Sequence, residues 1–259
     1  MPVSPRRRRR ASFALLVLLL VVVTGAVGVA FVTRLPACQF TPAAQCTRVL
    51  FIGNSYTFVN DLPATFARLA ASGGHTVETG MIAPGGAFLT DEAADANVAA
   101  TITGTTWAAV VLQEQSERPA NAAEWNVFIN AVNRLSAMAV DDGARAMLLE
   151  TWAHRDGWPE LGMDYAAMQR AIDEGYAQAA AQTGARVIPA GQAWQRALAA
   201  TLPVNLWQDD GSHPAPAGTY LAACVVYASI FGESPMGLRD HEGLPDAVAA
   251  ALQAIAAGG

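Results

Sequence analysis

The 259-residue sequence contains no lysine, and all 16 of its cationic residues are arginine. Residues 1–34 hold six of these arginines and no acidic residue, whereas the remainder of the chain has 10 arginines against 22 acids, a net charge of −12. Nucleic acids and other polyanions are bound by clustered lysine and arginine. The acidic part of the chain therefore argues against nucleic acid as a partner.

Cysteine and histidine are also scarce, with three and four residues respectively. The histidines lie far apart and no C-x-x-C pair is present, so we expect no metal site and no other cofactor. Cys38 and Cys46 stand eight residues apart and could form a disulfide in an oxidising compartment. Cys224 lies in an apolar run, which indicates a buried thiol.

The first 34 residues have the composition of an export signal. Five arginines at positions 6–10 precede 22 uncharged residues, 11–32, which as a helix would span roughly 33 Å, enough for the core of a bilayer. The arginines should stay in the cytoplasm. We therefore expect an N-terminal hydrophobic helix that anchors the chain in the cell membrane, with the remainder of the chain outside the cytoplasm. The alternative is a cleaved signal and a secreted protein.

Beyond residues 1–34 we expect a linker at residues 35–47 and one domain over residues 48–259. Short β-branched runs alternate there with longer helical ones. Strands are expected at residues 48–53, 76–82, 108–112, 145–151 and 186–189. Helices are expected at residues 63–71, 91–102, 122–140, 164–183, 192–200, 217–231 and 244–257. This alternation predicts a parallel sheet covered by helices on both faces.

In such a sheet, ligands bind at the carboxyl ends of the strands. Ser55 follows the first expected strand, in FIGNSYTF, where its hydroxyl could act as a nucleophile or cap the next helix. Asp210 and His213 lie three residues apart in DDGSHP, a turn that could present a carboxylate and an imidazole together. A serine nucleophile needs a base, and the base needs an orienting acceptor. Ser55, His213 and Asp210 are therefore our candidate catalytic triad.

Two further sets of residues follow other strands. His154, in TWAHRDGW after the fourth expected strand, is the competing candidate for the base, and its run favours a substrate-facing loop. An oxyanion needs hydrogen-bond donors beside the nucleophile. The backbone N–H groups of Ser55 and Gly86 are candidates, and Gln113 or Gln115 could add a side-chain amide.

Taken together, these motifs resemble the sequence blocks of the SGNH (GDSL-like) hydrolase superfamily. VLFIGNSYT is similar to its first block, with Asn54 in place of Asp, and PGGAFL resembles the second, with Gly86 as the oxyanion residue. DGSHPAPAGTYLAA is similar to the last block and supplies Asp210 and His213. The third block departs, because LQEQS replaces G-x-N-D. Matching by position puts Gln115 in place of the Asn, whereas LQ-x-x-S resembles an exported SGNH-like subgroup of unassigned function in which Gln113 recurs.

The resemblance implies an α/β fold, a flavodoxin-like three-layer α/β/α sandwich with a five-stranded parallel sheet. It also implies metal-independent hydrolysis of carboxylic esters by the triad. The expected substrates are small-molecule or glycan esters, as for a carbohydrate O-acetyl esterase or a short-chain acyl esterase. Two alternatives stay open: an SGNH-fold binding domain with altered catalysis, and an O-acyltransferase acting on a cell-surface glycan.

Overall fold

The computed structural model describes residue 38 and residues 45–258. The expected N-terminal hydrophobic helix and most of the expected linker lie outside the described residues. Within the part that is described, no helix is both long and apolar enough to cross a bilayer.

Five parallel strands form one sheet in the order β2-β1-β3-β4-β5. The strands are β1 Cys46–Ile52, β2 Thr76–Ile82, β3 Ala109–Leu112, β4 Arg145–Leu149 and β5 Arg186–Ile188. This is the flavodoxin-like strand order, in which the topological switch point lies between β1 and β3. The expected fold class is confirmed, although β1 begins two residues earlier than expected and so includes the end of the expected linker.

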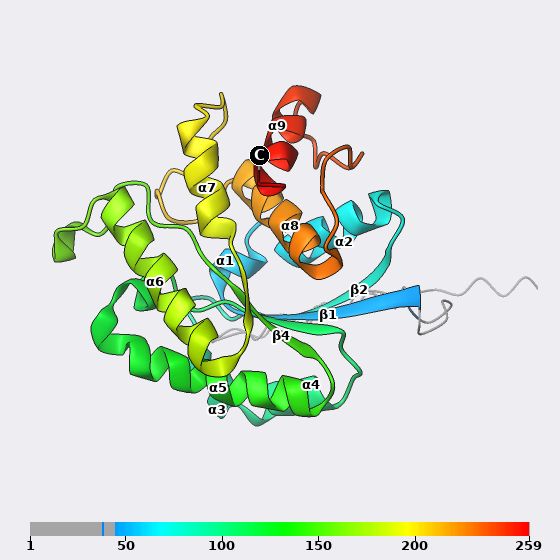
Figure 1. The fold of residues 1–259 in the computed structure, drawn as a ribbon, viewed down its shortest axis with the longest axis vertical. Coiled ribbons are helices and arrows are strands. Elements are labelled where there is room, and N and C mark those ends of the chain that lie inside the picture. The colour runs from blue at the N-terminus through cyan, green and yellow to red at the C-terminus, as the bar shows by residue number, and fades with distance from the viewer. Residues whose placement is uncertain (1–37, 39–44, 259) are drawn as a thin grey trace, which may run out of the picture.

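Helices cover both faces of the sheet (Figure 1). One layer contains α2 Leu62–Ser72, α7 Ala190–Ala199, α8 Pro216–Phe231 and α9 Asp246–Ala256. The other contains α3 Leu89–Ala94, α4 Ala96–Thr103, α5 Trp125–Asp141 and α6 Tyr165–Thr183. A short helix, α1 Ser55–Phe58, follows β1 and was not expected. The single helix expected at residues 91–102 is divided at Asp95, whose side chain caps α4 by accepting from the Asn97 N–H.

The central strand β1 shows how one sequence serves both layers. Val49 and Phe51 pack into the core under α2 and α8, whereas Leu50 and Ile52 pack into the core on the α5 side. All four side chains are fully buried. Successive side chains of a strand point to opposite faces, so an uninterrupted apolar run is what a strand buried on both faces requires.

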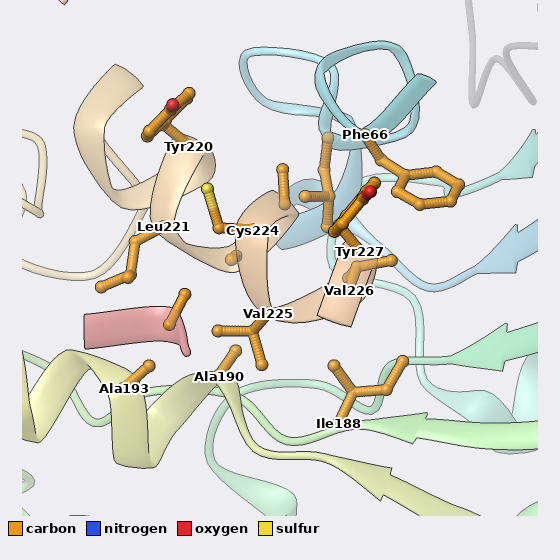
Figure 2. Close-up of a cluster of buried hydrophobic side chains, with 14 of the residues drawn as sticks. Phe66, Ile188, Ala190, Ala193, Tyr220, Leu221, Cys224, Val225, Val226 and Tyr227 are labelled. Atoms are coloured by element: carbon orange, nitrogen blue, oxygen red, sulfur yellow. The ribbon is translucent and has the colours of Figure 1, made fainter. Parts of the chain in front are cut away.

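Helix α8 is buried around most of its circumference and lies between α2, α7 and α9. Figure 2 shows Val225 facing Ile188 and Ala190, with Val226 and Tyr227 on the side of Phe66. Cys224 is fully buried and unpaired, as the sequence indicated. Because α8 begins three residues after His213, its rigid packing determines where that histidine enters the site.

The one disulfide among the described residues joins Cys38 to Cys46, with a Cα–Cα distance of 5.4 Å. Cys46 is the first residue of β1, and the Cys38 N–H donates to the Glu78 carboxylate on β2 at 3.3 Å. The disulfide therefore lies at the amino end of the sheet, opposite the carboxyl ends of the strands.

Candidate active site

Backbone hydrogen bonds join the carboxyl ends of the three strands nearest the switch point. The Gly53 N–H donates to Ile82 at 2.9 Å, and the Gln113 N–H donates to Ile52 at 2.8 Å. Ser55 is the first residue of α1, and Asn54 is its N-cap, accepting from the Tyr56 N–H at 3.0 Å. Since Asn54 caps this helix, the Ser55 hydroxyl is left available for another role.

The Ser55 hydroxyl lies beside His213, which comes from the other end of the chain. Ser55 Oγ is 2.9 Å from His213 Nε2, and His213 Nδ1 is 2.6 Å from Asp210 Oδ2. A carboxylate only accepts, so the hydrogen of the imidazole is on Nδ1 and the Ser55 hydroxyl donates to Nε2. The three side chains predicted as a triad are therefore brought together in the order that nucleophile, base and orienting acid require.

Asp210 is held by its own turn. Its Oδ1 accepts from the Ser212 N–H at 2.9 Å and from the His213 N–H at 3.0 Å. Partial burial acts to raise the pKa of Asp210, but these hydrogen bonds and the adjacent His213 outweigh it and hold the pKa below its ordinary value. The acid is therefore ionised at neutral pH. Its side chain is 47% exposed, and contact with water favours the same state.

His154, the competing base, is hydrogen-bonded to a different serine. Its Nε2 is hydrogen-bonded to Ser116 Oγ at 3.1 Å. Burial lowers the pKa of His154, outweighing the nearby negative charges of Glu117 and Asp210. The described residues therefore contain two Ser–His pairs. Only in the Ser55–His213 pair is the second imidazole nitrogen hydrogen-bonded to a carboxylate.

Gln113 is not placed as the side-chain donor to an oxyanion for which the sequence made it a candidate. Its Nε2 donates to Asn54 Oδ1 at 2.9 Å and to the Glu114 carbonyl at 2.6 Å. Its Oε1 accepts from the Asn54 N–H at 3.1 Å and from the Thr57 hydroxyl at 2.8 Å. Both amide hydrogens are used inside the protein, so Gln113 has none left for an oxyanion. It is a positioning residue that holds the Ser55 turn.

Close approach of Gln113 to this turn requires glycine at position 53. A Cβ at Gly53 would lie 2.5 Å from Gln113 Oε1 and 2.7 Å from Thr57 Oγ1. Contacts this short do not occur between such atoms, so any larger residue would displace the amide. This close approach explains why glycine stands at position 53 in FIGNSYTF.

Gly86 and Gln115 remain as predicted donors. Gly86 is exposed, has a φ of +72°, and its N–H has no acceptor among the described residues. Its loop is tied to the nucleophile turn because Asn54 Nδ2 donates to the Ala87 carbonyl at 3.1 Å. Gln115 Oε1 accepts from the N–H groups of Glu117 and Arg118, and its amide nitrogen has no partner among the described residues.

Stacked aromatic rings lie directly beneath the triad. Tyr56 stacks on Trp152 with ring centroids 4.9 Å apart, and Trp152 stacks on Trp194 at 4.1 Å. The edge of His213 meets Tyr56 at 5.6 Å. Trp152 and Trp194 are buried, so they form part of the floor and not a platform for substrate. Trp207 is half-buried and contacts Trp194 at the margin of the stack.

Two buried carboxyl groups anchor the loops around the site. Glu114, after β3, accepts from the N–H groups of Leu89 and Gln115, at 3.1 and 2.7 Å. Glu150, after β4, accepts from the backbone and side chain of Gln192, at 3.1 and 3.2 Å. Burial raises the pKa of each to about 7. Among the described residues, no group of three or more His, Cys, Asp or Glu side chains is placed to hold a metal ion.

Sequence reasoning missed Asn54, Tyr56 and Ser116 as parts of the site. Asn54, which stands where the family pattern has Asp, joins the Ser55 turn to both Gln113 and the Gly86 loop. The signal that could have found Ser116 is the LQ-x-x-S spacing. That spacing places Gln113 against the Ser55 turn and Ser116 against His154.

We predict that Gln113→Leu destabilises the protein by about 3 kcal/mol or more, because it leaves the buried Asn54 N–H and Thr57 hydroxyl without their acceptor. Unfolding free energies from chemical denaturation measure this. The control is Gln178→Leu, at an exposed position of α6, which should change stability by less than about 0.5 kcal/mol. Equal effects of the two substitutions would contradict this role for Gln113.

The buried carboxyls predict a decline in stability as the pH rises from 5.5 to 8. The pKa of Glu114 and of Glu150 is about 7 in the folded chain against about 4.5 when unfolded. Between these values the folded state keeps protons that the unfolded state has released, so unfolding becomes easier as the pH rises. We expect a loss of about 1–2 kcal/mol per carboxyl, measured by urea denaturation. Glu114→Gln should weaken this pH dependence, and an unchanged slope would show that Glu114 does not cause it.

No model of a protein family matches the chain, and a search of curated proteins finds no match. Solved structures do match. A protein of Slackia heliotrinireducens, described as an SGNH hydrolase, is 32% identical, with 71% of this chain and 99% of that chain covered and a TM-score of 0.61.

Two more distant structures share the fold. A DUF4886 family protein of Bacteroides uniformis is 18% identical, with 82% of this chain and 94% of that chain covered and a TM-score of 0.72. An acetylxylan esterase of Geobacillus stearothermophilus is 15% identical, with 71% and 94% covered and a TM-score of 0.56. Because the Slackia protein exceeds 30% identity over nearly its whole length, the chain belongs to the SGNH hydrolase family, whose members form a class of carboxylic ester hydrolases.

Proposed function

We propose that this chain is an extracytoplasmic serine esterase that removes short acyl groups, such as acetyl, from carbohydrate or other small alcohols. The observation that carries the proposal is the hydrogen-bonded series from Ser55 through His213 to Asp210, at 2.9 and 2.6 Å. A serine hydroxyl becomes a useful nucleophile when a base is within hydrogen-bond reach and is itself oriented by an acceptor.

In the first half of the reaction, His213 Nε2 takes the proton of Ser55 as Oγ attacks the ester carbonyl carbon. Asp210 stabilises the resulting imidazolium, aided by the two backbone N–H groups that keep it ionised. His213 then gives the proton to the alcohol oxygen, the C–O bond breaks, and the acyl group stays on Ser55. In the second half, His213 takes a proton from a water molecule as its oxygen attacks the acyl carbon. The bond between that carbon and Ser55 Oγ then breaks, His213 returns the proton to Oγ, and the acid is released.

The oxyanion formed in each half needs donors that are not already used. The N–H groups of Ser55 and Gly86 meet this condition among the described residues, and the Gln115 amide is the candidate for a third. Gln113 acts through the turn that carries Ser55. Removing one such donor in other enzymes lowers kcat by about 10²–10³.

The surroundings of the triad favour a small, hydroxylated substrate. The His213 side chain is 34% exposed, so the site is open. An open depression of about 430 Å³ adjoins Asp210, and its lining combines an indole with amide and carboxylate side chains: Asn205, Trp207, Gln208, Asp209, Asp210 and Ala215. Aromatic faces and polar side chains together suit sugars. The acetylxylan esterase with the same fold is consistent with such a substrate.

The extracytoplasmic location rests on the sequence of residues 1–34 and on the disulfide. Disulfides persist in oxidising compartments and are rare in the cytosol. The Cys38–Cys46 disulfide, which follows the predicted membrane helix in the sequence, agrees with a domain held outside the membrane.

We predict that Ser55→Ala lowers kcat on p-nitrophenyl acetate by at least about 10³-fold in the purified full chain, since no nucleophile remains. Ser234→Ala, at an exposed position beyond α8, serves as the control and should keep wild-type turnover. A fluorophosphonate probe should label the wild type and the control but not Ser55→Ala.

The same two measurements separate the alternatives. Full turnover by Ser55→Ala would refute the proposed nucleophile. An intact chain that neither reacts with the probe nor hydrolyses esters would instead identify a binding domain. If acyl groups appear on an added sugar in preference to water, the same triad acts as an O-acyltransferase.

For location, we predict that a membrane-impermeant maleimide labels intact cells expressing the full chain only after mild reduction. Reduction should expose the thiols of Cys38 and Cys46, while Cys224 stays unlabelled because it is fully buried. Labelled peptides are identified by mass spectrometry. Labelling that appears only after the cells are lysed would place the domain inside the cytoplasm.

A further inference from the structure

The second Ser–His pair is the polar feature near the site that the proposed mechanism does not use. Ser116 follows β3 and His154 follows β4, and Ser116 Oγ lies 3.1 Å from His154 Nε2. Ser116 is buried, with 7% of its surface exposed, and His154 is half-buried. The other nitrogen of the ring, Nδ1, has no partner among the described residues.

This pair is not built as a second nucleophile and base. No carboxylate orients His154 Nδ1, and Ser116 is too buried to reach an ester carbonyl. Ser116 also lies close to the Tyr56 hydroxyl. Burial raises the pKa of Tyr56, and the Ser116 side chain acts in the opposite direction. The Tyr56 hydroxyl is in turn hydrogen-bonded to Ser212 Oγ, at 2.6 Å. The hydroxyl of Ser116 thus fixes the imidazole ring and leaves Nδ1 available.

Hydrogen bonds on both sides of His154 attach it to the loop that carries Asp210 and His213. The Arg155 N–H donates to the Gly211 carbonyl at 2.7 Å, and the Trp152 indole N–H donates to the Ser212 carbonyl at 3.1 Å. The Trp207 indole N–H donates to the Ala153 carbonyl at 3.1 Å. His154 is therefore held at a set position relative to the triad.

The strand order places Gly86 and His154 on opposite sides of Ser55. With the strands in the order β2-β1-β3-β4, Gly86 follows the strand on one side of Ser55 and His154 follows a strand on the other. The proposed mechanism requires the carbonyl oxygen of the ester at the Gly86 N–H and the departing alcohol oxygen at His213, so the alcohol part would lie on the side of the His213 loop. The loop of His213 is the one bonded to the residues that flank His154.

We infer that His154 Nδ1 binds a hydroxyl group on the alcohol part of the ester, so that the enzyme selects esters of sugars or other polyols over esters of simple alcohols. This rests on the proposed function and names its substrate class. A hydroxyl both donates and accepts, so it can pair with Nδ1 in either tautomer. Burial lowers the pKa of His154, which keeps the ring neutral, and the negative charges of Glu117, Asp210 and Glu160 act on the ring, so an anionic group would be repelled.

The test compares two acetate esters of six-membered rings, mono-O-acetylated methyl xyloside and cyclohexyl acetate, which differ in their free hydroxyl groups. We expect the wild-type full chain to prefer the xyloside ester by about tenfold in kcat/KM. His154→Phe should lower kcat/KM for the xyloside ester by about tenfold, chiefly through KM, and leave cyclohexyl acetate within about twofold. His154→Asn, which restores a polar group near Nδ1, should recover part of the preference.

Equal losses on both esters with His154→Phe would show a merely structural role and overturn the inference, as would no loss on either. In both cases wild-type hydrolysis that depends on Ser55 would leave the proposed function intact. A wild-type chain that hydrolyses neither ester and is not labelled at Ser55 would overturn the proposed function and the inference together. Circular dichroism of both variants confirms that they fold.

Discussion

The candidate active site depends on one buried side-chain amide. Gln113 extends from the end of β3 to the turn after β1, and each of its two polar atoms takes part in two hydrogen bonds. Because the amide is shielded from water, each of these bonds would be costly to lose. The amide therefore fixes the turn that presents Ser55, and it does so at the switch point between β1 and β3. Gly53 makes the approach possible by having no Cβ.

The second half of the site is a loop that must be brought from far along the chain. Asp210 and His213 can pair within their own turn, since they are three residues apart. Their approach to Ser55 requires tertiary contacts: the Leu206–Ala215 hydrogen bond, the buried start of α8, and the bonds from Trp152 and Arg155. Tyr56, next to the nucleophile, closes this arrangement by contacting both His213 and Ser212.

Buried carboxyls anchor this site at some cost to stability. Glu114 ties the end of β3 to the start of α3, just beyond the Gly86 loop, and Glu150 ties the end of β4 to α7. Removing a carboxylate from water is unfavourable, which is why the pKa of each is raised to about 7. Perturbed carboxyls are frequent at functional sites, and here each accepts from backbone N–H groups of the loops around the site. Here they support the chemistry without taking part in it.

The sequence by itself determined the fold class and the order of the elements, and it pointed to Ser55, Asp210 and His213 as the candidate triad. Apolar runs such as VLFI and VVL specify strands buried on both faces, and the spacing of Asp210 and His213 is local, so both could be inferred from the chain alone. The predicted ends of the helices were less accurate. A cap such as Asp95 acts through a side-chain hydrogen bond, which the pattern of apolar residues does not reveal. Only the tertiary structure decided which glutamine holds the Ser55 turn and which histidine meets Ser55. Gln113 and Gln115 are two residues apart, and His154 and His213 both follow strand ends, so their roles depend on partners contributed by distant segments.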